Sequence, residues 1–332
     1  MPGVGLGAVL ISFVGFQAGA SRSILLNRAG QKRQFRANDE IDESARDVVW
    51  VHAYARSSSS TVLSMVSKAD SAHERSRVFS LFEPCHSGDI VTPELKQKGC
   101  QGMLDTVAHC DFSGIQKLHG WFDVHSIVRG KKGKYSPEQA SKFCKSSELV
   151  AFKTVSLPGE VFNFSEQAFP LLSRNPRMNM VKVIRDPRSI YASWHSTWPF
   201  RDTYPRNTAT LTAICDSLQD TLSIMKEGKH PQVHAIKFEE MIKEPEQAMR
   251  GLYESLKRPF GQEQQEWLRK TFRAEDCPEV QEWNEAYSDC HTSTRIPEPD
   301  KWRKVLTQEE KDAFAKHKQC QEISESMGYP LI

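Results

Sequence analysis

The sequence predicts an α/β fold, a single domain in which a central parallel sheet is flanked by helices. Short runs of β-branched and apolar residues alternate along the chain with segments of helical spacing, the pattern that gives a parallel sheet. The chain has 332 residues, of which 39% are hydrophobic and 26% charged, and this suits one large globular domain. Since ligands of such sheets bind at the carboxyl ends of the strands, we expect the functional site there.

Five short apolar runs are predicted as the strands of this sheet. Each contains valine, and two of them stop at a proline, Pro84 and Pro187, which has no N–H group for a sheet ladder. The five runs are residues 47–54, 77–84, 148–155, 179–187 and 232–240.

Helices are predicted between the strands and after the last one, from capping patterns and periodicity. "SPEQ" at 136–139 and "TQEE" at 307–310 are capping boxes, so a helix is expected to begin after each first residue. A third helix carries an apolar stripe at 3.6-residue spacing that is predicted to be core. The stripe consists of Leu211, Ile214, Cys215, Leu218, Leu222 and Met225.

The first 46 residues are predicted to lie outside the domain, which spans 47–332. Residues 4–20 carry no charge and basic residues follow them, so we interpret 1–20 as a signal peptide or signal anchor. A buried N-terminal strand or helix is the alternative. Residues 21–46 are mostly polar without clear periodicity and predict a stem or disordered arm.

Eight dispersed cysteines support the secretory route, because they form no C-x-x-C pair and are even in number. Free, buried thiols are the alternative. The sequon Asn163-Phe-Ser165 is compatible with the same compartment. The formal net charge of +2 argues against a general nucleic-acid binder, and nothing arranges histidine or cysteine as a metal site.

The segment "ARSSSST", residues 55–61, lies between the first strand and a segment with helical spacing. In that position successive N–H groups and the helix N-terminus converge on an anion. The hydroxyls from Ser57 to Thr61 would add donors and Arg56 a charge. A flexible serine linker is the alternative. The glycine-rich loop and lysine of nucleoside triphosphatases are absent, which disfavours a nucleotide kinase.

A second candidate anion site follows the fourth strand in "VIRDPRSIYASW". Arg185 stands at the strand exit and Ser193 two turns into the next helix, so a guanidinium fork and a hydroxyl could bind one phosphate. The alternative is a structural pair of Arg185 with Asp186 that caps the turn.

Taken together, these segments resemble the sulfotransferases that use 3′-phosphoadenosine 5′-phosphosulfate (PAPS), in particular the Golgi 6-O-sulfotransferases of galactose, N-acetylglucosamine and N-acetylgalactosamine. The resemblance covers about residues 47–330 and implies a P-loop-like sulfotransferase fold. It is carried in order by "RSSSS", "LFEP", "CDF", "FKTV", "VIRDPRSIYAS", "IKFEEMIKEP" and "KWRKVL".

The resemblance implies a binding site for PAPS. The 5′-phosphosulfate would be held by the loop, whose residues are Arg56, Ser57, Ser58, Ser59, Ser60 and Thr61, and the 3′-phosphate by Arg185 and Ser193. Ser58 stands where the family has glycine, so a positive φ there would cost about 1 kcal/mol. Near the C-terminus, Arg295, Trp302 and Arg303 resemble a segment that closes over the nucleotide, although Trp302 could equally be core.

The candidate catalytic residues are Glu83, Lys153 and Arg56. Glu83, in "LFEP" at the exit of the second strand, is the candidate base for the attacking hydroxyl, or else pairs with a loop arginine. Lys153, in "FKTV", would stabilise charge on the bridging oxygen or orient the acceptor, or else is a snorkelling lysine. Among the histidines, only His86 lies close to the candidate base in sequence.

The predicted function is transfer of a sulfuryl group from PAPS to a sugar hydroxyl, at 6-O, in a glycoprotein, proteoglycan or polysaccharide of the Golgi lumen. No metal is expected, nor any membrane contact except through an N-terminal anchor. A tyrosyl-protein sulfotransferase and a catalytically silent protein that binds a glycan or 3′-phosphoadenosine 5′-phosphate (PAP) are the alternatives. The acceptor, the disulfide pairing and the oligomeric state do not follow from the sequence.

Overall fold

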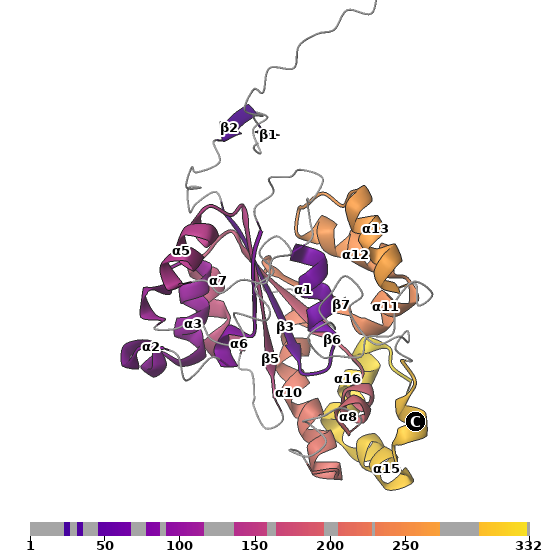
Figure 1. Cartoon of the computed structure of the whole chain (residues 1–332). Helices are drawn as coiled ribbons and strands as arrows, with labels where there is room; N and C mark the ends of the chain where they lie inside the picture. The colour runs from indigo at the N-terminus through magenta and orange to yellow at the C-terminus, as the bar shows by residue number, and fades with distance from the viewer. Residues whose placement is uncertain are drawn as a thin grey trace, which may run out of the picture. The chain divides into compact units, whose positions relative to one another are not determined.

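Five parallel strands in the order β4-β5-β3-β6-β7 form the sheet of this protein, seen in a computed structural model (Figure 1). The strands are β3 (Asp47–Tyr54), β4 (Val78–Phe82), β5 (Leu149–Ser156), β6 (Met178–Ile184) and β7 (Val233–Lys237). Each overlaps one of the five predicted runs, with β5 ending one residue after its run and β6 beginning one residue before its run, so the predicted α/β fold with a parallel sheet is confirmed. The structure describes residues 23–26, 32–35, 46–67, 78–86, 91–115, 136–157, 164–195, 205–227, 230–272 and 299–330.

Helices cover both faces of the sheet (Figure 1). On one face, α3 (Gly99–Ala108), α5 (Pro137–Lys145) and α7 (Phe169–Arg174) pack on Trp50 and Phe152. On the other, α1 (Ser59–Ser67), α11 (Phe238–Lys243), α12 (Pro245–Ser255) and α13 (Gln262–Phe272) pack on Val51 and Val183. Alternate residues of β3 thus enter different cores, because successive strand side chains point to opposite faces.

A third core lies at the end of the sheet where the strands stop. It joins α8 (Pro187–His195) and α10 (Thr208–Glu227) to the C-terminal helices α14 (Trp302–Val305), α15 (Gln308–Lys316) and α16 (Lys318–Met327). The remaining described helices are α2 (Pro93–Gln97), α6 (Phe164–Gln167), and the 3₁₀ turns η2 (Pro84–His86) and η3 (Phe112–Gly114).

The predicted capping boxes are present in both helices. The side chains of Ser136 and Gln139 cap the start of α5 reciprocally, and those of Thr307 and Glu310 do so for α15. The stripe of α10 is buried at Leu211, Ile214, Cys215, Leu218 and Leu222, whereas the side chain of Met225 lies outside the described part of the chain.

The chain divides into two compact units, residues 1–39 and residues 40–332. The described residues of the first unit are two short antiparallel strands, β1 (Ser23–Leu26) and β2 (Lys32–Phe35), within the predicted stem. The predicted signal segment, residues 1–20, lies outside the described residues, and the domain boundary at residue 46 stays a prediction. Among the helices that the structure describes, none has the length and apolarity needed to span a membrane.

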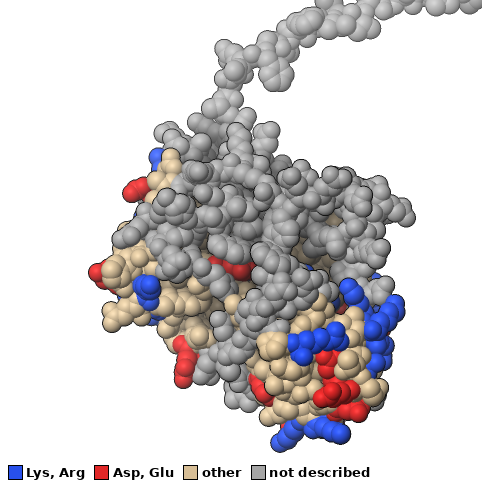
Figure 2. Space-filling model, turned by 60° about the horizontal axis from the view of Figure 1, so that its bottom comes forward, with Lys and Arg blue, Asp and Glu red and all other residues tan. Residues whose placement is uncertain are grey.

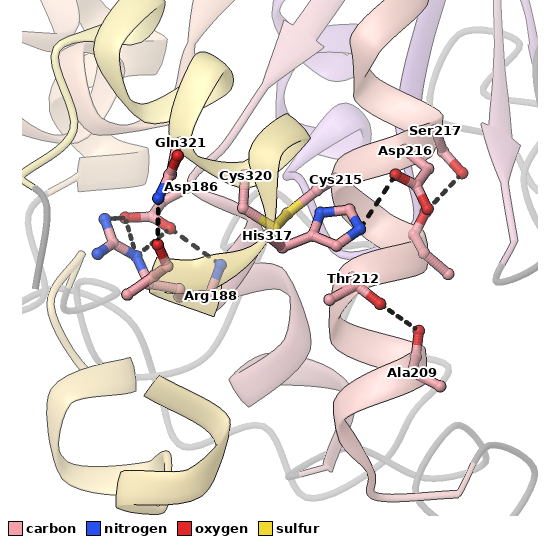
Figure 3. Close-up of a disulfide and its surroundings, with 12 residues drawn as sticks. Asp186, Arg188, Ala209, Thr212, Cys215, Asp216, Ser217, His317, Cys320 and Gln321 are labelled. Atoms are coloured by element: carbon pink, nitrogen blue, oxygen red, sulfur yellow. Dashed lines mark hydrogen bonds and ion pairs between the residues drawn. A yellow bond between two sulfur atoms is a disulfide. The ribbon is translucent and has the colours of Figure 1, made fainter. Parts of the chain in front are cut away.

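Three disulfides connect elements that are distant in sequence. They join Cys85 to Cys100, Cys110 to Cys144, and Cys215 to Cys320, the last linking α10 to α16 (Figure 3). The prediction of disulfides is therefore confirmed for the six described cysteines, and Cys215 is more than an apolar member of the α10 stripe. The three bonds indicate an oxidising, secretory environment.

Candidate active site at the carboxyl ends of the strands

The loop between β3 and α1 has an unusual backbone conformation. Arg56 has φ 71° and Ser58 has φ 65°, both in the left-handed region that side chains disfavour. The flanks of the loop are fixed by hydrogen bonds, because the N–H of Ser57 donates to Tyr54 O at 3.1 Å and Nε1 of Trp194 donates to Ala55 O at 3.0 Å. Ser58 therefore occupies the kind of position for which glycine is preferred.

The same loop holds a buried hydroxyl and the first N–H groups of a helix. Ser57 is fully buried, and its hydroxyl oxygen has no hydrogen-bond partner in the described structure. Ser59 and Ser60 begin α1, so their N–H groups precede the first intrahelical bonds; the bonds of this turn start with the N–H of Thr61 donating to Ser58 O at 3.1 Å. The loop thus presents donors that an anion would satisfy.

Arg185, at the end of β6, is directed to this loop. Its Nη1 donates to Arg56 O at 2.7 Å, and the guanidinium lies 4.2 Å from the ring centroid of Phe238. The side chain is buried, and its Nε has no partner among the described residues. Burial lowers the pKa of Arg185 to about 10, although the carboxylate of Glu239 opposes this shift.

Ser193, on α8, reaches the loop through Arg56, whose Nε donates to Ser193 Oγ at 3.4 Å. The two predicted phosphate sites are therefore contiguous. Asp186 does not form the alternative pair with Arg185. It binds the guanidinium of Arg188 instead, with Nη2 2.7 Å from Oδ2, and this pair is buried at the start of α8 (Figure 3).

Glu83 and Lys153 form a close ion pair beside the loop. Nζ of Lys153 lies 2.6 Å from Oε1 of Glu83 and 3.4 Å from Oγ of Ser59. Lys153 is buried, so it does not snorkel to the surface as the alternative would require. Burial lowers its pKa, and the charge of Glu83 opposes that shift. Glu83 itself has φ 51°, so the exit of β4 has a strained backbone.

Two predicted residues of the C-terminal segment lie in different surroundings. Trp302 is 1% exposed and belongs to the third core, with the Arg188 guanidinium 3.9 Å from its ring centroid, so the structure favours the core alternative over stacking on a nucleotide. Arg303 pairs with Asp300 at 3.5 Å, and both side chains are exposed. On the described surface that Figure 2 shows, Lys and Arg side chains lie beside Asp and Glu side chains. Arg295 and the side chain of His86 lie outside the described residues.

Sequence reasoning gave no role to three residues around Arg185. Phe238 lies under its guanidinium, Glu239 accepts a hydrogen bond from the N–H of Asp186 at 2.9 Å, and Tyr329 donates to Glu239 at 3.0 Å. The segment "IKFEE" after β7 was the available signal for the first two, whereas nothing local marks Tyr329. No group of three His, Cys, Asp or Glu side chains that could hold a metal occurs in the described part of the chain.

Comparison with known proteins identifies a family for this chain. The family described as "Sulfotransferase domain" matches residues 46–328. No curated protein gives a match. Similar solved structures include a sulfotransferase domain from the curacin biosynthetic pathway, with 15% identity, TM-score 0.48, and coverage of 86% of this chain and 99% of that one. A mouse sulfotransferase complexed with PAP has 9% identity, TM-score 0.49, and coverage of 88% and 90%. Retinol dehydratase in complex with androsterone and PAP has 14% identity, TM-score 0.43, and coverage of 86% and 81%.

Proposed function

Because the chain belongs to the sulfotransferase domain family, whose reaction is sulfuryl transfer from PAPS, we propose that it sulfates a sugar hydroxyl of a glycan, at 6-O, in the Golgi lumen. The observation that carries the proposal is the juxtaposition of two groups. The donors of Ser57 and Arg185 that have no partner among the described residues suit a phosphate-bearing ligand, and the Glu83–Lys153 pair adjoins them through Ser59.

The residues present fit PAPS as the sulfuryl donor. Ser57 and the first-turn N–H groups of α1 would hold the 5′-phosphosulfate together with Arg56, and Arg185 and Ser193 would hold the 3′-phosphate. When bound, PAPS supplies an activated sulfuryl group with a phosphate leaving group. The contact between Arg56 and Ser193 links the two phosphate sites.

The chain's own contribution to the chemistry is proton transfer and charge stabilisation. Glu83 would accept the proton of the attacking sugar hydroxyl as the new oxygen–sulfur bond forms. Lys153 bridges Glu83 and Ser59, so its ammonium would stabilise the negative charge that develops on the bridging oxygen as the sulfur–oxygen bond to the phosphate breaks.

A glycan acceptor in the Golgi is supported by two features of the chain. The seven sequence segments follow the order found in the Golgi 6-O-sulfotransferases, and the three disulfides require an oxidising compartment. The proposal of a glycan rests on the resemblance, since the acceptor contacts belong to loops rather than to the sheet.

The deciding experiment is transfer from labelled PAPS across a panel of saccharides and acidic tyrosine peptides, with the position of the product mapped. We expect sulfate at the 6-O position of a hexose or hexosamine, and transfer slowed at least about a hundredfold in the Glu83→Gln variant. Sulfation of the peptides alone would replace the proposal with tyrosyl-protein sulfotransfer. PAP binding without any transfer would make the chain a silent binding protein.

A further inference from the structure

The carboxylate of Glu239, at the start of α11, has both oxygens engaged. Oε1 accepts the backbone N–H of Asp186 at 2.9 Å, and Oε2 accepts the hydroxyl of Tyr329 at 3.0 Å. Glu239 therefore fixes the turn between β6 and α8 on one side and the C-terminal tail on the other.

Tyr329 is held firmly in this position. Gly328 ends α16 in the left-handed conformation, with φ 70°, and turns the tail back towards the sheet. On the far side of the tyrosine, Nη1 of Arg188 donates to Pro330 O at 2.8 Å. Tyr329 is 8% exposed, and its hydroxyl donates to Glu239, so the side chain is confined to the neighbourhood of that carboxylate.

Arg185 lies within the electrostatic influence of Glu239 but is not paired with it. The carboxylate favours the charged guanidinium of Arg185. Yet no ion pair joins the two in the described structure, and Nε of Arg185 keeps no partner although it is buried. A buried arginine next to a carboxylate ordinarily forms a forked pair with it, and that pair would use the N–H groups that a phosphate needs.

We propose that Tyr329 is a positioning residue for donor binding: by occupying Oε2 of Glu239, it keeps that carboxylate from capturing Arg185 and leaves the guanidinium available to a phosphate of the donor. The inference rests on the proposed role of Arg185 in binding PAPS. The carboxylate of Glu239 thus compensates the buried charge of Arg185 without competing with the phosphate for the hydrogen bonds of the guanidinium.

The test is calorimetric titration of the full chain with PAP, comparing the wild type with Tyr329→Phe, Glu239→Gln and the double variant. In Tyr329→Phe, Oε2 of Glu239 loses its hydrogen-bond donor and can pair with the guanidinium of Arg185. We therefore expect PAP affinity to fall on the order of tenfold. In the double variant the competing charge is gone, so most of the affinity should return. Glu239→Gln alone should bind PAP more tightly than the wild type, because an anion beside the phosphate site is removed.

A merely structural role for Tyr329 predicts the opposite outcome. The losses of PAP affinity in the two single variants would then add. A double variant that binds PAP as weakly as Tyr329→Phe, or more weakly, overturns the inference. Tyr253→Phe is the matched control, since that buried hydroxyl bonds Met65 O at 2.9 Å in the last turn of α1, away from the phosphate sites. It should lower the melting temperature without changing PAP affinity.

Two further results separate this inference from the proposed function. If Tyr329→Phe does not fold, Glu239→Gln still decides, because a loss of PAP affinity in that variant contradicts the competition. If Arg185→Lys weakens PAP binding while Tyr329→Phe does not, the inference fails and the proposed function stands. If Arg185→Lys has no effect, the assigned role of Arg185 fails, and the inference with it.

Discussion

Nζ of Lys153 lies 2.6 Å from Oε1 of Glu83 and 3.4 Å from Oγ of Ser59, so one buried ammonium joins the candidate base to the start of α1. The backbone holds this arrangement, because β4 and β5 pair at Phe82 and Lys153 and the N–H of Glu83 donates to Lys153 O at 2.9 Å. The candidate base and the anion loop are thus parts of one connected structure.

Replacing the candidate base tests the proposed chemistry most directly. Glu83→Gln keeps the shape of the side chain but cannot accept a proton, so kcat should fall by about 10²- to 10⁴-fold. PAP affinity should stay within a few fold, because the phosphate sites are intact. Glu246→Gln, which changes an exposed carboxylate on α12, is the matched control. A kcat near that of the wild type would refute the role of Glu83 as base.

The pH dependence of the reaction tests Lys153. The amine of Lys153 must be protonated to stabilise the leaving group, and burial lowers the pKa of Lys153 from the ordinary 10.5. Activity should therefore decline as the pH rises through that lowered pKa, before an exposed lysine would titrate. Lys153→Arg should have a lower kcat but no such alkaline decline, because arginine stays protonated. The measurement is kcat/KM against pH, with the exposed Lys243→Arg as control; an alkaline limb that persists in Lys153→Arg would exclude Lys153 as its source.

Arg185 is predicted to contribute to donor binding through its planar fork. Arg185→Lys retains the charge but loses the paired N–H groups, so PAP affinity should fall by about 10- to 100-fold while the acceptor KM changes little. Arg177→Lys provides the control, because Arg177 pairs with Asp47 at the opposite end of the strands. Equal losses in donor and acceptor binding would indicate a general disturbance of the site instead.

The left-handed conformation of Ser58 predicts a stabilising substitution. Ser58→Gly removes the strain at φ 65° and should raise the free energy of unfolding by up to about 1 kcal/mol, with donor affinity equal or higher. Ser60 lies two residues further along the chain, within α1. Ser60→Gly should instead lower the free energy of unfolding by about 0.5–1 kcal/mol. Urea denaturation of both variants checks the pair, and changes of the same sign would contradict the strain argument.

Glu310 is predicted to stabilise the C-terminal helices in a pH-dependent way. Burial alone would raise its pKa, but hydrogen bonds from Arg206, Tyr191 and the N–H of Thr307 outweigh this and lower it to about 2. A carboxyl with a lowered pKa contributes its full stabilisation at pH values above its ordinary pKa of 4.5. That contribution is lost as the pH falls towards 2.

Glu310→Gln should therefore lower the free energy of unfolding near neutral pH by about 1–3 kcal/mol, the range allowing for the partial exposure of Arg206. The difference from the wild type should shrink below pH 4.5. Unfolding titrations at neutral and acid pH measure this, with the exposed neighbour Glu309→Gln as control. A difference that is independent of pH would show that packing, not charge, accounts for the effect.

Part of the fold was predictable because the elements concerned have a local signal. The five strands are short valine-containing runs, and the two capping boxes announce α5 and α15 within four residues each. The family match over residues 46–328 confirms the predicted sulfotransferase class, while the glycan acceptor stays a prediction. Trp302 shows the limit of local reasoning, because a tryptophan flanked by cations looks alike whether it is core or binding surface.

The sequence by itself determined that the serine loop, Glu83 and Arg185 directly follow strands, and therefore that they share one edge of the sheet. That follows from the period of a strand and the direction of parallel strands. Lys153 differs, because it lies inside β5 and comes next to Glu83 only because β4 ends opposite it, at Phe82. Only the tertiary structure decided the partners: Lys153 with Glu83, Asp186 with Arg188, and Tyr329 with Glu239. Ion pairs and hydrogen bonds depend on distances of a few ångströms between residues up to 90 positions apart, and no local pattern in the sequence records such distances.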